Sequence, residues 1–245
     1  MILAQLNPNI DLSIVVLCYK AGEDVYSFVE RLKAVLETLD INWELILVGN
    51  YNKGDLSDST PRVVKDIASK DERIVGLAQE KQGMMGWDAR CGLDAASGKV
   101  IGFTDGDNQF PSEDVARVYR ELIEKDLDMA QTYRKTRGDG VFRAIQSQGF
   151  NILFAMFFPG MGLKDVNSKP KLFSRSLFDK MELTSDDWFI DAEMAIQARR
   201  YKARVGDIPT VFLQLEERKS FTRLSTVFEF VLNLAKARFA EFFRM

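Results

Sequence analysis

Short apolar runs and amphipathic stretches alternate through the first half of the chain, and this alternation most constrains the fold. The apolar runs are rich in β-branched residues, as buried strands are; they cover residues 12–17, 43–48, 73–77 and 100–104. Between them, apolar residues recur at three- and four-residue steps, which predicts helices over residues 25–39, 60–68 and 84–96. Alternating strands and helices predict an α/β fold in which helices flank a mostly parallel, Rossmann-like sheet.

The pattern predicts a further helix over residues 113–125 and a strand over residues 128–132. Beyond residue 132 it does not define the order of helices and strands. The chain has 245 residues, of which 46% are hydrophobic, so it can bury a full core. We find no internal repeat, low-complexity tract or long linker. We therefore expect one domain with two halves, at about residues 1–115 and 116–245.

Composition excludes several kinds of chemistry. The chain has no histidine, which removes catalytic triads and zinc sites that depend on imidazole. Its net charge of −3 argues against nucleic-acid binding by general charge neutralisation. Cys18 and Cys91 lack the spacing of a metal site, so we expect buried free thiols. Chemistry must rest on carboxylates and cations.

Two acidic residues stand where the strand over residues 100–104 ends. In the sequence Asp105-Gly106-Asp107, side chains two apart on an extended segment point to the same side, and Gly106 lets the backbone approach a ligand. Paired carboxylates suit Mg²⁺ or Mn²⁺ bound together with substrate phosphates. Taken alone, the motif would better suit an acidic β-turn in solvent.

The surrounding residues resemble the family 2 glycosyltransferases, most closely the polyprenyl-phosphate sugar transferases of the dolichyl-phosphate mannose synthase type. Residues 12–23 are similar to the first strand and following turn of that family, and residues 83–98 to its Gly-rich helix. The pattern Asp105-x-Asp107-x-Gln109-x-Pro111-x-Glu113 repeats its metal loop, and residues 165–175 take the place of its acceptor-side segment. The resemblance covers most of the chain and implies a GT-A fold.

It also implies a nucleotide-sugar and metal half, residues 1–115, followed by an acceptor half. The expected ligands of Mg²⁺ or Mn²⁺ are Asp105, Asp107 and Gln109. Nucleotide-sugar contacts are expected from Tyr19, Glu23, Asn50, Gly83, Gly86, Arg90, Asp105 and Gly106. Where the family usually has Asp-Asp-Gly-Ser, this chain has Gly49-Asn50-Tyr51-Asn52, so the base contact falls to the amide of Asn50, or to Asp55 or Asp58.

The acceptor that the resemblance implies is a polyprenyl phosphate such as dolichyl or undecaprenyl phosphate, glycosylated with inversion at the sugar C1. Arginine and lysine bind phosphate oxygens, and the candidates are Arg134, Arg137, Arg143 and Lys169. Solvated surface charge is the alternative for this cluster. If the acceptor were instead a saccharide hydroxyl in glycan assembly, Asp191 is the candidate general base, although it also suits the start of a helix. A third alternative is a catalytically lapsed nucleotide-sugar binding subunit.

The C-terminal residues 221–243 carry an apolar stripe at helical steps: Leu224, Phe228, Val231, Ala235, Phe239 and Phe242. Residues 199–245 contain ten Lys or Arg against five Asp or Glu, a pattern typical of an interfacial helix, although core packing or dimerisation would also produce the stripe. The longest apolar run, residues 152–161, is shorter than the ~20 residues that span a bilayer. With no signal peptide in residues 1–8, we expect a cytosolic enzyme, peripheral on the membrane, with homo-oligomerisation left open.

Overall fold

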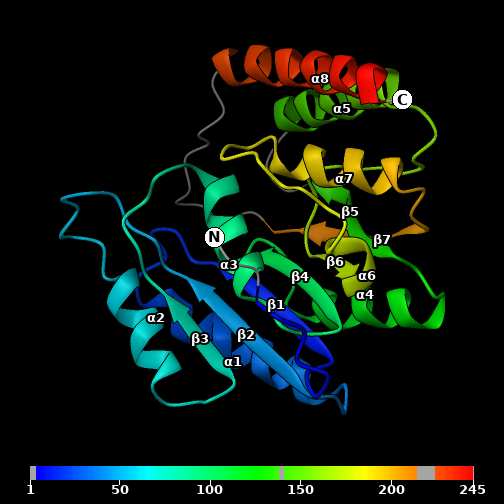
Figure 1. Cartoon of the computed structure of the whole chain (residues 1–245). Helices are drawn as coiled ribbons and strands as arrows, with labels where there is room; N and C mark the ends of the chain where they lie inside the picture. Colours follow the sequence, from blue (N-terminus) through cyan, green and yellow to red (C-terminus); the bar gives the residue numbers. More distant parts are fainter. Residues whose placement is uncertain (1–3, 138–140, 214–223, 245) are drawn as a thin grey trace.

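The computed structural model describes residues 4–137, 141–213 and 224–244 (Figure 1). Its centre is a seven-stranded sheet in the order β3-β2-β1-β4-β6-β5-β7. The elements, in chain order, are β1 Leu12–Leu17, α1 Asp24–Glu37, β2 Trp43–Val48, α2 Thr60–Ala68, β3 Ile74–Leu77, α3 Met85–Ala95, β4 Val100–Asp105, α4 Glu113–Glu124, β5 Met129–Arg137, α5 Val141–Phe157, β6 Lys171–Ser174, α6 Arg175–Phe178, α7 Ile190–Arg200, β7 Val205–Phe212 and α8 Leu224–Arg244.

The expected fold class is confirmed. The strands β1 to β4 pair in parallel, as do β5 and β7, whereas β6 runs antiparallel to both β4 and β5. The predicted strands at residues 12–17 and 43–48 and the predicted helix at residues 60–68 match β1, β2 and α2 residue for residue. The strand expected at residues 128–132 instead extends to Arg137, because β7 pairs along its whole length.

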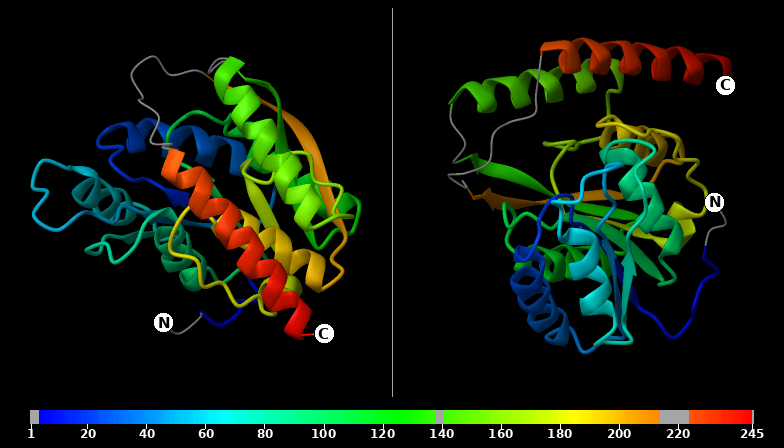
Figure 2. Two further views of the ribbon diagram at one scale, coloured as in Figure 1. Left: turned by 90° about the horizontal axis from the view of Figure 1, so that it is seen from above. Right: turned by 90° about the vertical axis from the view of Figure 1, so that its left-hand side faces the viewer.

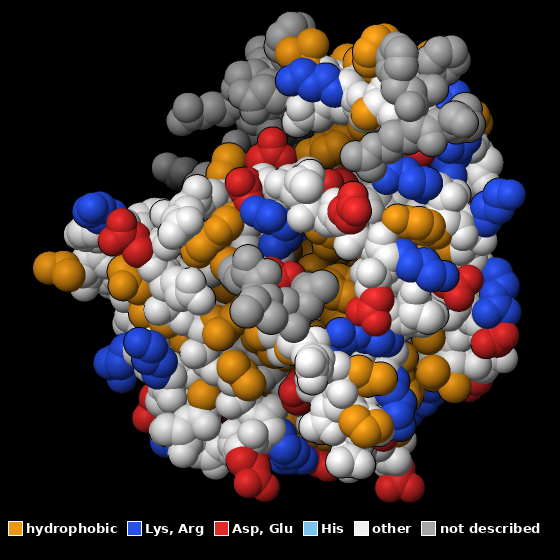
Figure 3. Space-filling model, in the orientation of Figure 1, with side chains coloured by type: hydrophobic (Ala, Val, Ile, Leu, Met, Phe, Trp, Pro, Cys, Tyr) orange, Lys and Arg blue, Asp and Glu red, His pale blue; other side chains and the backbone are white. Residues whose placement is uncertain are grey.

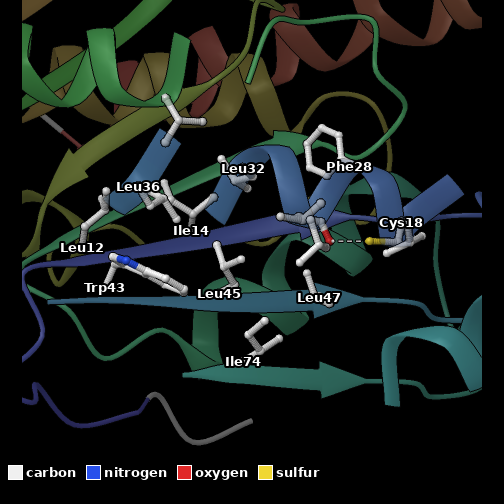
Figure 4. Packing of buried hydrophobic residues seen from close by; sticks show 14 of the residues in the cluster. Leu12, Ile14, Cys18, Phe28, Leu32, Leu36, Trp43, Leu45, Leu47 and Ile74 are labelled. Atoms are coloured by element: carbon white, nitrogen blue, oxygen red, sulfur yellow. Dashed lines mark hydrogen bonds between the residues drawn. The ribbon is translucent and has the colours of Figure 1, made fainter. Parts of the chain in front are cut away.

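Helices cover both faces of the sheet. Figure 4 shows one face, where α1 places Phe28, Leu32 and Leu36 over Ile14 of β1 and Leu45 of β2. On the other face, residues of α3, α6 and α7 pack against β1, β4 and β6. All six residues of β1 are buried, as expected for a parallel strand covered on both sides.

A third layer lies beyond α7. The helices α5 and α8 lie side by side above α7 and away from the sheet, as the views of Figure 2 show. Phe154 of α5, Phe158 directly after it, and Phe230 and Leu234 of α8 form a separate apolar cluster with residues of α7. No helix of the described ranges is both long and apolar enough to cross a bilayer.

Candidate functional site

The carboxyl ends of β1, β2, β3 and β4 meet at one edge of the sheet. Asp105 lies opposite Leu17 in the strand register, and hydrogen bonds continue beyond the strands: the Gly106 N–H donates to the Leu17 carbonyl (2.9 Å), and the Cys18 N–H donates to the Val48 carbonyl (2.9 Å). These bonds bring Tyr19, Asn50 and Asp105 to one place, which is the usual location of ligands in open α/β sheets.

Gly106 allows a close approach of the backbone at this edge. A Cβ atom on Gly106 would lie 2.9 Å from Cγ1 of Val16 and 3.2 Å from the Leu17 carbonyl oxygen, closer than side-chain carbons pack. Beyond it, the Gln109 N–H donates to Oδ1 of Asp107 (3.1 Å), and the Leu213 N–H after β7 donates to the Gln109 carbonyl (2.9 Å). The loop of the acidic motif is therefore held at both of its sides.

Two aspartates and two lysines form a buried charge network beside the acidic motif. Nζ of Lys169 lies 3.4 Å from Oδ2 of Asp105 and 3.3 Å from Oδ2 of Asp191, and Nζ of Lys171 lies 3.1 Å from Oδ1 of Asp191. Lys169 and Asp191 are only 4% and 2% exposed, and Lys171 is fully buried. The network joins β4, the segment before β6, β6 itself and α7.

The titration behaviour of this network follows from burial and charge. Burial alone would raise the pKa of Asp191, but the two ammonium groups outweigh it and hold the pKa below its ordinary value. Burial lowers the pKa of Lys171. Burial also acts to lower the pKa of Lys169, but the carboxylates of Asp105 and Asp191 outweigh it and the net pKa is raised. Asp191 is therefore a weak base with little access to a substrate.

The oxygen donors at the edge suit a hard divalent cation. Asp105 is partly exposed, Asp107 and Gln109 follow within one turn, and each offers a carboxylate or amide oxygen. Among the residues that the structure describes, no three His, Cys, Asp or Glu side chains gather as a metal cage. Two carboxylates completed by substrate phosphates are the usual arrangement for Mg²⁺, so the residues present fit such an ion.

The expected phosphate cluster is only partly described. Arg134 on β5 forms a two-point contact with Asp165, from Nε to Oδ2 (2.5 Å) and from Nη2 to Oδ1 (2.8 Å). Burial raises the pKa of Asp165, but the Arg134 guanidinium outweighs it and the net pKa is lowered. Arg134 is thus engaged within the protein, and the side chains of Arg137 and Arg143 lie outside the described residues.

Asn50 is also engaged. Its Nδ2 donates to Oδ1 of Asp88 (2.9 Å), and its Oδ1 accepts a hydrogen bond from the Gln79 N–H (2.9 Å). The second carboxylate oxygen of Asp88 contacts Nζ of Lys81, and burial raises the pKa of Asp88. The amide expected to read the base is therefore used to fix the ends of β2, β3 and α3, which leaves it without a free edge.

Tyr19 lies beside this cluster. Nζ of Lys81 lies 4.5 Å from the centre of the Tyr19 ring, and the Tyr19 hydroxyl accepts a hydrogen bond from Nδ2 of Asn52 (2.9 Å). Asp55, on the loop that follows, pairs with Lys20 at 2.8 Å, and that contact lowers its pKa to about 2. Tyr19, Lys81 and Asn52 are therefore the polar groups gathered at the ends of β1, β2 and β3.

The other residues expected to contact the nucleotide-sugar make contacts within the protein. Arg90 pairs with Asp186, and a Cβ atom on Gly86 would lie 2.5 Å from the Ser185 carbonyl oxygen. A Cβ atom on Gly83 would likewise lie 2.5 Å from Cβ of Trp87. These three residues bring α3 against residues 185–187 before α7. Glu23 lies exposed at the start of α1 and pairs with Arg62 on α2.

Sequence reasoning named most of these residues but not their partners. Lys169 was expected as a phosphate ligand and Asp191 as a base, whereas the structure brings both, together with Lys171, into one buried network. The pairing of Asp88 with Lys81 and Asn50 was missed. The signal was present as a charged residue on the apolar side of a predicted helix, where an unpaired carboxylate would be costly.

Comparison with known proteins adds evidence from sequence and fold. The profile of "Glycosyl transferase family 2" matches residues 13–182. Among similar proteins is a dodecaprenyl-phosphate galacturonate synthase of Rhizobium johnstonii, 28% identical over 235 residues, which cover 94% of this chain and 67% of that protein. An undecaprenyl-phosphate 4-deoxy-4-formamido-L-arabinose transferase of Salmonella paratyphi A is 25% identical over 169 residues. That match covers 69% of this chain and half of the Salmonella enzyme.

Solved structures agree on the fold. The glucosyl-3-phosphoglycerate synthase of Mycobacterium tuberculosis, solved with Mn²⁺, UDP and phosphoglyceric acid, superposes with a TM-score of 0.63 at 14% identity. The superposition covers 93% of this chain and 77% of that one. The same enzyme with UDP alone gives a TM-score of 0.66. At this identity the likeness shows a shared GT-A fold.

Proposed function

The chain belongs to glycosyl transferase family 2, and we propose that it transfers a sugar from a nucleoside diphosphate sugar to a polyprenyl phosphate, with inversion at the sugar C1. Membership of the family makes it a glycosyltransferase. Both similar proteins named above carry a polyprenyl phosphate in their names, which supports this acceptor. The matched part of the chain spans about two thirds of the Rhizobium protein and half of the Salmonella protein.

The donor is assigned to the carboxyl edge of β1 to β4. Tyr19 offers a ring face for the base, with Lys81 and Asn52 as polar neighbours. Asp105, Asp107 and Gln109 would hold Mg²⁺ or Mn²⁺ together with the donor diphosphate, in line with the Mn²⁺ and UDP of the mycobacterial structure. When bound, such an ion supplies charge stabilisation to the leaving nucleoside diphosphate.

The state of Asp191 is the observation that carries the phosphate acceptor. A saccharide hydroxyl needs a general base to take its proton, and a base must reach that proton. Asp191 is 2% exposed, lies between two ammonium groups and has a lowered pKa, so it fits that task poorly. A phosphate monoester already carries about −1.5 to −2 charges near neutral pH and needs no such base. Its cationic partners are assigned to Arg137 at the end of β5 and Arg143 in α5, with Arg134 anchoring β5 to Asp165.

A surface for a lipid acceptor is assigned to α5 and α8. In the predicted stripe of α8, Phe239 is 66% exposed and Ala235 is exposed, whereas the buried contacts with α5 and α7 come from Phe230 and Leu234. The side chains of the stripe residues Leu224, Phe228 and Phe242 lie outside the described residues. On α5, Met156 is 73% exposed and Ile152 is exposed. Figure 3 shows apolar and basic side chains together at this end of the molecule. We assign it peripheral contact with the cytosolic membrane face.

The proposal is tested by incubating the purified chain with Mn²⁺ or Mg²⁺ and a panel of UDP- and GDP-sugars, with and without a short polyprenyl phosphate. Release of nucleoside diphosphate is measured for each donor. We expect release with one donor that depends on both metal and lipid, and we expect Asp107→Asn to abolish it while Asp126→Asn, an exposed carboxylate at the end of α4, does not. If nucleoside diphosphate were released from every donor to the same extent with and without the lipid, the proposed acceptor would be contradicted.

A further inference from the structure

The ammonium group of Lys169 lies between the carboxylates of Asp105 and Asp191. Its Nζ lies 3.4 Å from one carboxylate and 3.3 Å from the other, so the ammonium separates two groups that could otherwise share a cation. Apolar groups surround it: the Phe103 ring centre lies 5.5 Å away and Sδ of Met85 lies 3.7 Å away.

We propose that Lys169 is an internal counter-ion of Asp105 that keeps metal affinity low until the donor diphosphate is present. This inference rests on the proposed function, because it assumes that Asp105 is a metal ligand. It goes beyond it by making metal entry depend on the donor. Since Lys169 is buried and touches carboxylates, it acts through Asp105 and is a positioning residue.

Lys169 acts on metal binding through its charge. Lys169 lies beside Asp105 and cancels about one unit of the negative charge that the acidic motif presents to an arriving ion. A diphosphate adds at least two further negative charges, so an ion that arrives with the donor meets a much more favourable site. Lys169 need not leave when the ion binds, because Asp191 remains as its partner.

Lys171 holds Asp191, the second partner of Lys169, in place. Its Nζ donates to the Val166 and Ser168 carbonyls (2.6 Å each) and lies 3.1 Å from Oδ1 of Asp191. It therefore holds Asp191 without contacting Asp105 in the structure. This gives a matched comparison: Lys169 and Lys171 are both buried lysines paired with Asp191, but Lys169 alone of the two is paired with Asp105.

The test is titration of Mn²⁺ alone, followed by electron paramagnetic resonance, on the purified full chain and its variants. We expect Lys169→Met to bind Mn²⁺ about tenfold more tightly than the wild-type chain. Lys169→Arg, which keeps the charge, and Lys171→Met should stay within about threefold of it. Unchanged or weaker Mn²⁺ binding in a folded Lys169→Met variant would overturn the inference.

A second variant keeps the test decisive if Lys169→Met does not fold. Asp191→Asn removes the competing partner of Lys169, so the ammonium should neutralise Asp105 more fully and Mn²⁺ should bind more weakly; tighter binding would contradict the inference. Asp105→Asn separates the two levels of the argument. If it leaves Mn²⁺ affinity unchanged, the metal site itself is wrong, whereas if it abolishes binding and the lysine variants have no effect, the counter-ion role alone fails.

Discussion

Arg134 and Asp165 form a two-point ion pair, with Nε 2.5 Å from Oδ2 and Nη2 2.8 Å from Oδ1. The pair joins β5 to the segment that leads to Lys169, and Gln131 supports it by donating to the Asp165 carbonyl (2.8 Å). The position of Lys169 beside Asp105 therefore depends on a contact made some distance away, on the acceptor half of the chain.

Asp165→Asn should destabilise the protein, because it removes the carboxylate charge that pairs with the mostly buried Arg134 guanidinium. Breaking a buried pair from one side costs about 3 to 5 kcal/mol. The free energy of unfolding in urea measures the effect. Asp126→Asn, which breaks an exposed pair with Arg204, is the control and should give no measurable change. Equal effects of the two variants would contradict the role given to Asp165.

Acid should destabilise the fold through Asp165 and Asp191, whose pKa values are both lowered in the folded chain. A carboxylate with a lowered pKa contributes stability that is present above its ordinary value near about 4 and is lost as the pH falls through the folded value. Unfolding in urea at pH 7, 4 and 3 should show a declining free energy. The decline should be shallower in Asp165→Asn; an identical slope would show that Asp165 does not contribute.

Gly86→Ala should destabilise the chain and lower activity, because the added methyl group would meet the carbonyl oxygens of Ser185 and Asp187 at 2.5 and 2.6 Å. Overpacking of this kind lowers the free energy of unfolding by about 1 to 3 kcal/mol. Gly149→Ala on α5 is the matched control, since nothing lies within 4 Å of its added methyl group. There the helix propensity of alanine should stabilise the protein by about 0.5 to 1 kcal/mol. Thermal unfolding of both variants checks the contrast.

Asn50→Asp should be harmful even though the family usually carries an aspartate in this region. In the wild-type chain Nδ2 of Asn50 donates to Oδ1 of Asp88 at 2.9 Å, in a buried site. The substitution would place a second carboxylate in the position of this amide, against that of Asp88. We expect a lower melting temperature at pH 7. The exchange Asn50→Asp with Asp88→Asn should recover most of the loss, because one amide and one carboxylate again face each other. Failure of the exchange to recover stability would show that the pairing is not the cause.

Vesicle binding should depend on the exposed residues of α5 and α8. Met156→Ser combined with Phe239→Ser should reduce flotation with anionic vesicles at least fivefold, because both side chains are exposed and apolar. Leu56→Ser is the control, since Leu56 is 99% exposed on the loop before α2. Undiminished flotation of the double variant would contradict the membrane surface assigned to these helices.

The strands that the sequence predicts well are those whose environment is uniform along their length. β1 and β2 are almost wholly buried, so their apolar runs begin and end with the strands. β7 was missed because it is an edge strand with exposed positions and contains Pro209, which an edge tolerates and a pattern search counts against a strand. β6 was missed because it has four residues and begins with the buried Lys171.

The site was predictable where residue type and backbone direction suffice. Asp105 is the last residue of β4 and Asp107 follows it, and ligands of open α/β sheets bind at the carboxyl ends of the strands, where Tyr19 also lies. Pairings were not predictable, since a lysine such as Lys169 carries no sign in the sequence of whether a phosphate or an aspartate lies beside it. That choice is set by packing between β4 and α7, which the local pattern does not encode.

The most direct test of the account compares two lipids that differ only in the phosphate. The chain is incubated with metal, its preferred labelled nucleotide-sugar, and either a polyprenyl phosphate or the polyprenol of the same length, and label extracted into organic solvent is counted. The account predicts transfer to the phosphate and none to the alcohol. Equal transfer to both lipids, or transfer to a saccharide hydroxyl with neither lipid labelled, would contradict it.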